Sequence, residues 1–126
     1  MFSDLGLLAL RVIPAAMLCF GHGLKKAAEF STLSQTFPDP LGVGSTFSLI
    51  LTLFGEVFCP CLVMLGIGTR LFSAPTFLMM LVIAFSVHAG DPWSKQEFAL
   101  LYAIPFFVLV LTGGGRFALD PYLRKR

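Results

Sequence analysis

The sequence predicts an all-α protein, an integral membrane antiparallel four-helix bundle built as one domain from residues 1–126. Composition is the first observation: 56% of the residues are hydrophobic and 13% are charged, too few polar residues to cover a soluble domain of this size. The apolar residues also fall into four runs, each near the roughly 20 residues that a bilayer-crossing helix needs. These runs lack the alternation of barrel strands, and a segment in lipid must satisfy its own backbone hydrogen bonds.

The four predicted spans cover approximately residues 5–24, 45–67, 71–89 and 97–113. The first is expected to remain as a spanning helix, because Arg11 interrupts its apolar run and no Lys or Arg precedes it, unlike a secretory signal peptide. Only Gly68-Thr69-Arg70 separates the second span from the third, which predicts an antiparallel hairpin. The fourth is the shortest and is expected to recruit flanking residues or to thin the bilayer locally.

The longest connection runs over residues 25–44, where Pro38-Asp39-Pro40 and Gly42-Val43-Gly44 mark turns. It also contains three large apolar residues, Phe30, Leu33 and Phe37. We therefore expect it to lie on the membrane surface or to cover one end of the bundle. The last connection contains Trp93, a residue type typical of the membrane interface.

Basic residues predict the orientation, because Lys and Arg are more frequent in cytoplasmic segments. One side of the predicted topology carries five of them, Arg70, Arg116, Arg124, Lys125 and Arg126, and the other carries three, Lys25, Lys26 and Lys95. Both termini are therefore expected in the cytoplasm. The net charge of +2 is small and scattered, so nucleic acid is not an expected partner.

Each of the first three spans carries a polar stripe at helical spacing. The stripes are Arg11, Ala15, Leu18, His22 and Lys26; Ser48, Thr52, Glu56, Cys59 and Val63; and Ser73, Phe77, Met80, Ala84 and His88. Glu56 lies near mid-bilayer, where a carboxylate costs about 2.5–3.5 kcal/mol on insertion scales. We therefore expect the stripes to face the interior of the bundle.

Two pairs of ionisable residues are candidate site residues. Arg11 and Glu56 are predicted to come within reach of each other, either as a structural ion pair that fixes helix register or as a proton or ligand site. His22 and His88 are predicted at similar depth. They are suited to ligating a haem or metal, to hydrogen-bonding a quinone carbonyl, or to meeting water at the interface. Two histidines without a third ligand at a typical spacing do not define a metal site, so none is assigned.

The three cysteines, Cys19, Cys59 and Cys61, lie within apolar runs, which does not suggest a secreted disulfide framework. Residues i and i+2 of a helix point about 200° apart, so Cys59 and Cys61 do not converge without a kink. Pro60 between them lacks an N–H and is expected to free the carbonyl of Glu56. Apolar packing, thiol redox chemistry and Cu(I) binding all remain open for these thiols.

In order along the chain, these residues resemble the DoxX family of small four-helix membrane proteins. The matching positions are Leu10-Arg11, His22-Gly23, Lys26, Glu56, Gly66-Ile67-Gly68-Thr69-Arg70, His88 and Gly115-Arg116-Phe117-Ala118-Leu119-Asp120. The resemblance covers nearly the whole chain. One departure is Cys59-Pro60-Cys61, where the family tends to place small glycines.

The resemblance implies a multi-pass protein of the bacterial cytoplasmic (inner) membrane, similar to the membrane subunit of thiosulfate:quinone oxidoreductase. We expect a quinone-linked redox subunit in which Glu56 and Arg11 are catalytic and His22, His88 and Lys26 bind quinone. No flavin, haem or iron–sulfur motif is present, so electrons are expected from a substrate, a thiol pair or a partner redox protein. The alternative is a non-catalytic scaffold or assembly subunit of a larger complex.

Small residues on the first and second spans permit close helix contacts, either within one chain or between chains. They are Gly6, Ala9, Gly66 and Gly68. Beyond the surrounding lipid bilayer, the sequence therefore leaves an oligomer open as a further partner.

Overall fold

The computed structural model describes residues 2–119, which form helices and turns with no strand in that range. Of these described residues, 77% are helical. The helical segments are α1 Phe2–Leu18, η1 Cys19–Gly23, α2 Leu24–Ala28, α3 Phe30–Leu33, α4 Ser45–Leu53, η2 Phe54–Phe58, α5 Cys59–Leu65, α6 Thr69–Val82, η3 Ile83–Val87 and α7 Trp93–Thr112, where η marks a π-helix.

Four of the continuous helices are long and apolar enough to cross a membrane: Phe2–Ala28, Ser45–Leu65, Thr69–Val87 and Trp93–Thr112. This confirms the all-α membrane class and the four predicted spans. The first helix extends further than predicted at both ends, because polar residues end an apolar run without breaking backbone hydrogen bonds. The fourth helix begins at Trp93, so it has 20 residues and is longer than the third, which has 19. Trp93 is therefore in the first turn of α7, where its indole N–H donates to Glu97 at 2.8 Å.

The second span ends at Leu65, two residues earlier than predicted, because the backbone turns at glycine. Gly66 has a φ of 77° and Gly68 a φ of 57°, left-handed values that cost glycine little. A side chain at Gly66 would also clash with Ala118. Nearby, the Leu119 N–H donates to the Leu65 carbonyl at 3.2 Å. The tight turn thus brings the segment after α7 against the end of α5.

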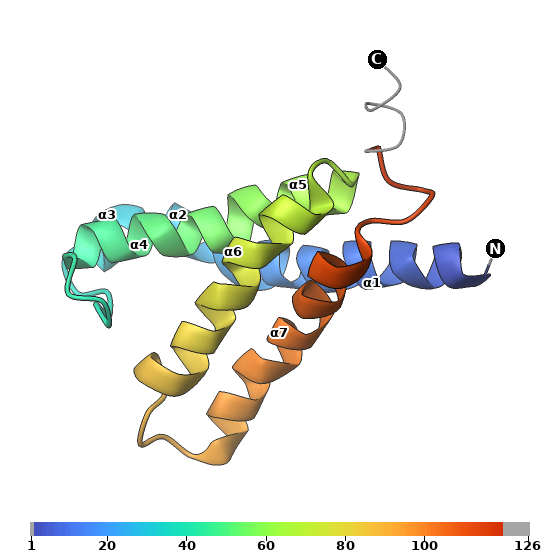
Figure 1. Ribbon diagram of the computed structural model, residues 1–126. Helices are drawn as coiled ribbons and strands as arrows, with labels where there is room; N and C mark the ends of the chain where they lie inside the picture. The colour runs from blue at the N-terminus through green and yellow to red at the C-terminus, as the bar shows by residue number, and fades with distance from the viewer. Residues whose placement is uncertain (1, 120–126) are drawn as a thin grey trace.

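The spans pack as two pairs (Figure 1). The α1 helix lies beside α5, α3 lies beside α4, and α6 lies beside α7. Consecutive spans run in alternating directions in this view, and the two pairs cross. The regular antiparallel bundle stays a prediction. The orientation in the membrane does too, and the basic tail Arg124, Lys125 and Arg126 on which it partly depends lies outside the described residues.

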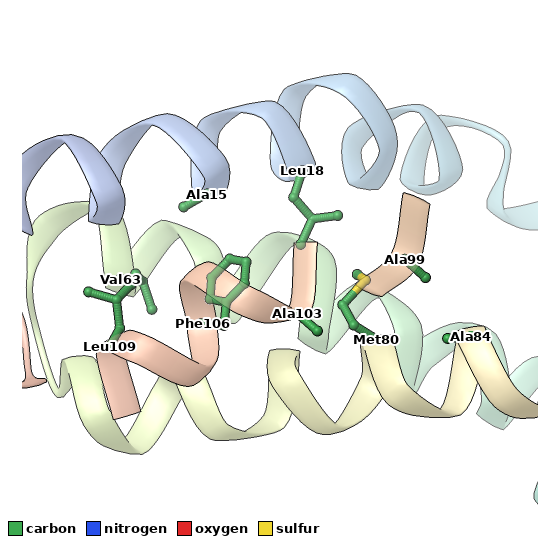
Figure 2. Close-up of a cluster of buried hydrophobic side chains, with 9 residues drawn as sticks. All are labelled: Ala15, Leu18, Val63, Met80, Ala84, Ala99, Ala103, Phe106 and Leu109. Carbon is green, nitrogen blue, oxygen red and sulfur yellow. The ribbon is translucent and has the colours of Figure 1, made fainter. Parts of the chain in front are cut away.

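The core between the pairs combines small and large side chains (Figure 2). It contains Ala15, Leu18, Val63, Met80, Ala84, Ala99, Ala103, Phe106 and Leu109. The alanines let helices approach closely, as in other membrane bundles, and Phe106 fills the space between them without exposure. Large apolar residues such as Phe20, Ile50 and Leu101 point outward instead. This distribution suits a protein whose surroundings are lipid.

The polar stripes face the interior, as the sequence predicts. The buried polar residues of the described chain are Arg11, Ser48, Glu56, Thr69, Ser73 and Thr76. Lipid offers these groups no hydrogen bonds, so each one is turned toward neighbouring helices. The interior of the fold is therefore where polar chemistry is available.

Candidate functional site

Each of the first three spans contains a π-helical segment, in which backbone hydrogen bonds skip one extra residue. His22 lies in η1 and Glu56 lies in η2, while His88 directly follows η3. Such segments are rare and are frequent at functional sites. Three of the predicted site residues are thus presented by locally widened turns.

Pro60 explains the widened turn in the second span. The Cys59 N–H bonds to the Phe54 carbonyl, five residues earlier, and Pro60 has no N–H to offer the next carbonyl, that of Gly55. The Thr76 hydroxyl of α6 donates to that carbonyl at 2.8 Å. The carbonyl that Thr76 satisfies is therefore one residue before the Glu56 carbonyl that the sequence singled out, because the π-helix shifts the bonding register by one residue.

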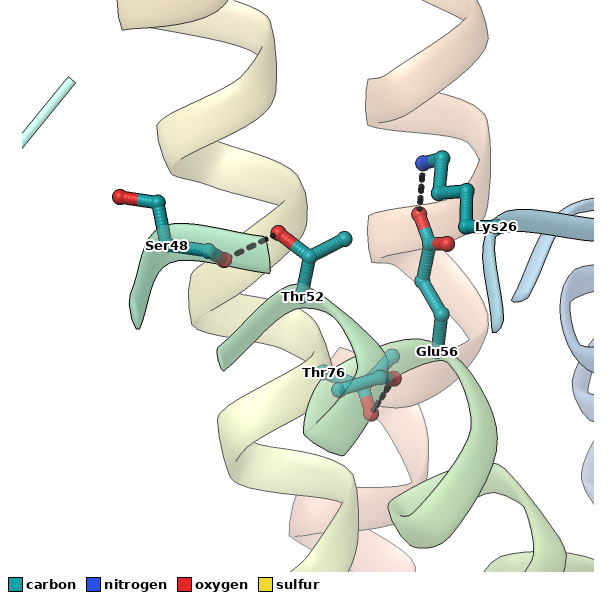
Figure 3. A network of polar contacts seen from close by, with 6 residues as sticks. Lys26, Ser48, Thr52, Glu56 and Thr76 are labelled. Carbon is teal, nitrogen blue, oxygen red and sulfur yellow. Dashed lines mark hydrogen bonds and ion pairs between the residues drawn. The ribbon is translucent and has the colours of Figure 1, made fainter. Parts of the chain in front are cut away.

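Glu56 forms an ion pair with Lys26 (Figure 3). The Lys26 Nζ lies 2.8 Å from the Glu56 Oε1. The Glu56 side chain is 3% exposed and that of Lys26 is 29% exposed, so the carboxylate is buried while the ammonium reaches the surface. The Glu56 Oε2 is buried and accepts no hydrogen bond from residues 2–119. One oxygen is neutralised and the other remains available to a ligand.

Arg11 does not pair with Glu56 within the described chain, and this expectation is wrong. Its guanidinium donates instead to the carbonyls of Val63 at 3.3 Å, Met64, and Phe117 at 3.2 Å. Val63 lies seven residues beyond Glu56, about 10 Å along the helix. Carbonyls at the end of a helix have few backbone partners, and the guanidinium adds donors there, although the Val63 carbonyl also accepts from the Gly66 N–H at 3.0 Å. Arg11 thus holds the end of α5 and the segment after α7 together.

A cavity of about 190 Å³ brings the other four predicted residues together. It is lined by Leu18, His22, Lys26, Glu56, Met80, Ile83, His88, Phe98, Ala99 and Tyr102. Residues of all four spanning segments, or of their immediate continuations, therefore enclose one space. It is small, partly polar and adjacent to the buried carboxylate.

Sequence reasoning missed Phe98 and Tyr102, both on α7. They are four residues apart, which places them on one helix face, and their rings meet at 5.3 Å between centroids. The His22 ring contacts both edge-on, at 5.6 Å from Phe98 and 5.8 Å from Tyr102. The signal available in the sequence was a tyrosine one helical turn after a phenylalanine within an apolar run.

His88 is oriented by its own neighbours. Its Nδ1 lies 2.9 Å from the Asp91 carboxylate, and its carbonyl accepts from the Gln96 side chain at 3.2 Å. His22 has aromatic contacts and His88 a carboxylate, so the two imidazoles have different surroundings. Within residues 2–119, no group of three or more His, Cys, Asp or Glu is placed to hold a metal ion.

A larger groove of about 550 Å³ adjoins the cavity. Lys26, Ile83 and His88 line both spaces. The remaining groove residues are mostly apolar: Phe37, Pro38, Pro40, Leu41, Ser48, Leu51, Thr52, Phe54, Gly55, Pro75, Leu78, Met79, Val82 and Val87. Residues from the 25–44 connection therefore line this groove. The Lys26 Nζ lies 5.9 Å from the centroid of the Phe37 ring.

Comparison with known proteins adds the family context. The DoxX family model matches residues 6–89, a range that includes all five site residues predicted from the sequence but not Phe98 or Tyr102. A protein of Haemophilus influenzae described as uncharacterized is 26% identical, over 98% of this chain and 86% of its own length. A Bacillus subtilis protein named "Putative oxidoreductase CatD" is 29% identical, over 97% of this chain and 90% of its own length. No solved structure matches the chain significantly.

Proposed function

The chain belongs to the DoxX family, and on that premise we propose that it is the membrane subunit of a redox system that reduces quinone between its helices. The observation that carries the proposal is the buried Glu56 carboxylate. One of its oxygens is paired with Lys26 and the other is without a hydrogen bond from residues 2–119. An acid inside a membrane is costly to bury, and one that lies beside a cavity is a candidate for a ligand site or a proton path.

The shapes of the two spaces suit a molecule with a flat head and an apolar tail. The quinone ring occupies the small cavity, where His22 and the Tyr102 hydroxyl are available to donate to its carbonyl oxygens. The tail lies in the larger groove, whose lining is mostly apolar. Ligand sites commonly combine an apolar wall with a few polar groups that fix orientation.

Quinone reduction consumes two electrons and two protons. In the proposed mechanism a proton moves from the Lys26 ammonium to the Glu56 carboxylate, and Glu56 passes it to a quinone oxygen as negative charge develops there, which is general acid catalysis by positioned side chains. Lys26 holds the carboxylate in place and, being partly exposed, connects it with the membrane surface from which the proton is replaced. Arg11 takes no part in this step, because its contacts lie at the end of α5.

The proposed setting is the bacterial inner membrane, with both termini in the cytoplasm and a partner redox protein as electron donor. The relative named as an oxidoreductase supports the reaction class. A scaffold role is the second candidate. It is favoured by Arg11, because the hydrogen bonds that Arg11 donates to backbone carbonyls hold separate parts of the chain together. The two candidates differ in one measurable property, since a scaffold carries no quinone through purification.

The test compares the wild-type protein with Glu56→Gln in lipid nanodiscs, using decylubiquinone as ligand and calorimetry to measure binding. We expect Glu56→Gln to weaken binding or, in membranes with the native donor, to slow quinone reduction at least tenfold. Glu29→Gln is the matched control, because Glu29 is an exposed carboxylate just beyond α2. Unchanged binding and unchanged reduction in a correctly inserted Glu56→Gln protein would refute the proposal.

A further inference from the structure

Two cysteines from different helices face each other. The Cys19 Sγ in η1 lies 3.8 Å from the Cys61 Sγ in α5, although 42 positions separate them in the chain. Cys19 is 1% exposed, and Cys61 is partly exposed. A disulfide has a sulfur–sulfur distance of about 2.0 Å, so the two sulfur atoms need to approach by about 2 Å.

Cys59 is not part of this pair. It is fully buried and lies two residues before Cys61, so the helix directs the two side chains to different faces. From the sequence, apolar packing, thiol redox chemistry and Cu(I) binding were all open for Cys59 and Cys61; the structure places Cys61 beside Cys19. Cys59 is therefore an internal control, because it lies on the same helix as Cys61, two residues away, but does not face Cys19.

The thiol pair lies on the same two spans as the proposed quinone site. Cys19 precedes His22 by three residues within η1 and directly follows Leu18, which lines the cavity. Cys61 follows Glu56 by five residues. With a rise of about 1.5 Å per residue, both thiols lie within about two helical turns of the cavity.

We propose that Cys19 and Cys61 are the redox-active dithiol from which the bound quinone receives its electrons, an inference that rests on the proposed function. Two S–H bonds break, one S–S bond forms, and two electrons and two protons are released. The quinone takes up both electrons and two protons, one of which arrives through Glu56, and becomes hydroquinone, while one thiol proton is released to the membrane surface. A reducing dithiol of the partner protein then restores Cys19 and Cys61 by thiol–disulfide exchange, leaving the partner oxidised to its disulfide.

The closing experiment counts free thiols by alkylation and mass spectrometry in purified, reduced protein reconstituted in nanodiscs. After anaerobic incubation with decylubiquinone, the wild-type protein is expected to fall from three alkylated thiols to one. Cys59→Ser should fall from two to none, whereas Cys19→Ser and Cys61→Ser should keep both remaining thiols. One hydroquinone should appear per disulfide, measured by absorbance.

Diamide, a chemical thiol oxidant, separates this inference from the proposed quinone site. If diamide leaves three free thiols in the wild-type protein, or links cysteines between chains, the dithiol does not exist. If diamide closes the Cys19–Cys61 disulfide and decylubiquinone binds without oxidising it, the dithiol is not the electron donor, while the quinone site stands. If decylubiquinone does not bind, the proposed function fails and the donor role fails with it, and the diamide result still decides the dithiol.

Discussion

The Lys26 ammonium lies 2.8 Å from the Glu56 carboxylate, across the interface between the first and second spans. Lys26 lies one helical turn after His22, so one helix face carries both the imidazole and the cation. The pair brings a buried negative charge and a partly exposed positive charge together at the edge of the cavity. One ion pair therefore balances the buried charge at the edge of the cavity and adds to the contacts between the two spans.

Replacing Lys26 by Met is expected to destabilise the protein, because Glu56 would keep its buried charge without a partner. A fully buried pair loses about 3–5 kcal/mol when one partner is removed. Lys26 is partly exposed, so we expect about 2 kcal/mol. Thermal unfolding in detergent measures the effect.

The neighbouring exposed lysine supplies the control for this prediction, and Lys25→Met should unfold like the wild-type protein. Adding Glu56→Gln to Lys26→Met should recover part of the loss, since the unpaired charge is then removed. A double variant no more stable than Lys26→Met alone would contradict the charge explanation.

Gly23 is expected to control how closely the first two spans approach. A Cβ at this position would lie 2.6 Å from the Val57 side chain and 2.8 Å from the Glu56 carbonyl oxygen, and the backbone atom cannot easily move. Gly23→Ala should therefore cost about 1–3 kcal/mol, as overpacking does, and should weaken binding of decylubiquinone. Thermal unfolding and calorimetry measure the two effects.

Gly21 provides a matched comparison within the same π-helical segment. A Cβ there meets nothing within 4 Å, so Gly21→Ala should be neutral in stability and binding. Equal losses from the two substitutions would contradict the close approach at Gly23 as the cause, because alanine by itself favours a helix more than glycine does.

Arg11 is expected to matter for the end of the fold and not for quinone affinity. Arg11→Met removes donors to the carbonyls of Val63, Met64 and Phe117. The Val63 carbonyl keeps the Gly66 N–H, and each buried carbonyl that is left unsatisfied costs about 1–3 kcal/mol. Hydrogen exchange should accelerate over residues 113–119, while decylubiquinone affinity stays within twofold. Arg11→Lys should be more stable than Arg11→Met but less stable than the wild-type protein, because an ammonium lacks the planar, forked arrangement of donors of a guanidinium. If Arg11→Met lost much of its decylubiquinone affinity while hydrogen exchange over residues 113–119 stayed unchanged, Arg11 would belong to the quinone site and not to the end of the fold.

Asp39 makes the 25–44 connection sensitive to acid. The Ser48 hydroxyl, followed by the Gly44 and Val43 N–H groups, holds the pKa of the Asp39 carboxyl below its ordinary value. The folded pKa is lower than the unfolded pKa of about 3.9, so the stabilisation is complete above that value and is lost as the pH falls through the folded pKa.

Pepsin cleavage between pH 5 and pH 2, corrected with an unfolded substrate, measures this effect. Cleavage of the wild-type connection should accelerate below about pH 4, and Asp39→Asn should be cleaved faster already at pH 5. Glu29→Gln, which alters another exposed carboxylate, should follow the wild-type curve. A wild-type curve that is flat over this range would refute the role of Asp39.

The sequence by itself determined the membrane class, the four spans and the inward direction of the polar stripes. The physical reason is that lipid penalises polar side chains and unpaired backbone groups wherever they occur. Hydropathy and helical spacing are therefore enough to find the spans and to orient Glu56 and Ser73. They also sufficed to select His22 and Lys26 as cavity residues, since both lie on one face of the first span.

Only the tertiary structure decided which polar groups meet. The π-helical segments insert one residue each, which turns the following side chains by about 100°, and local spacing does not reveal this shift. The positions of these residues along the crossing helices then place Glu56 opposite Lys26. Arg11 lies farther along, opposite the end of α5. Helix packing likewise places Tyr102 against His22 and Cys61 against Cys19. These are contacts between residues far apart in the chain, and packing, not sequence periodicity, selects them.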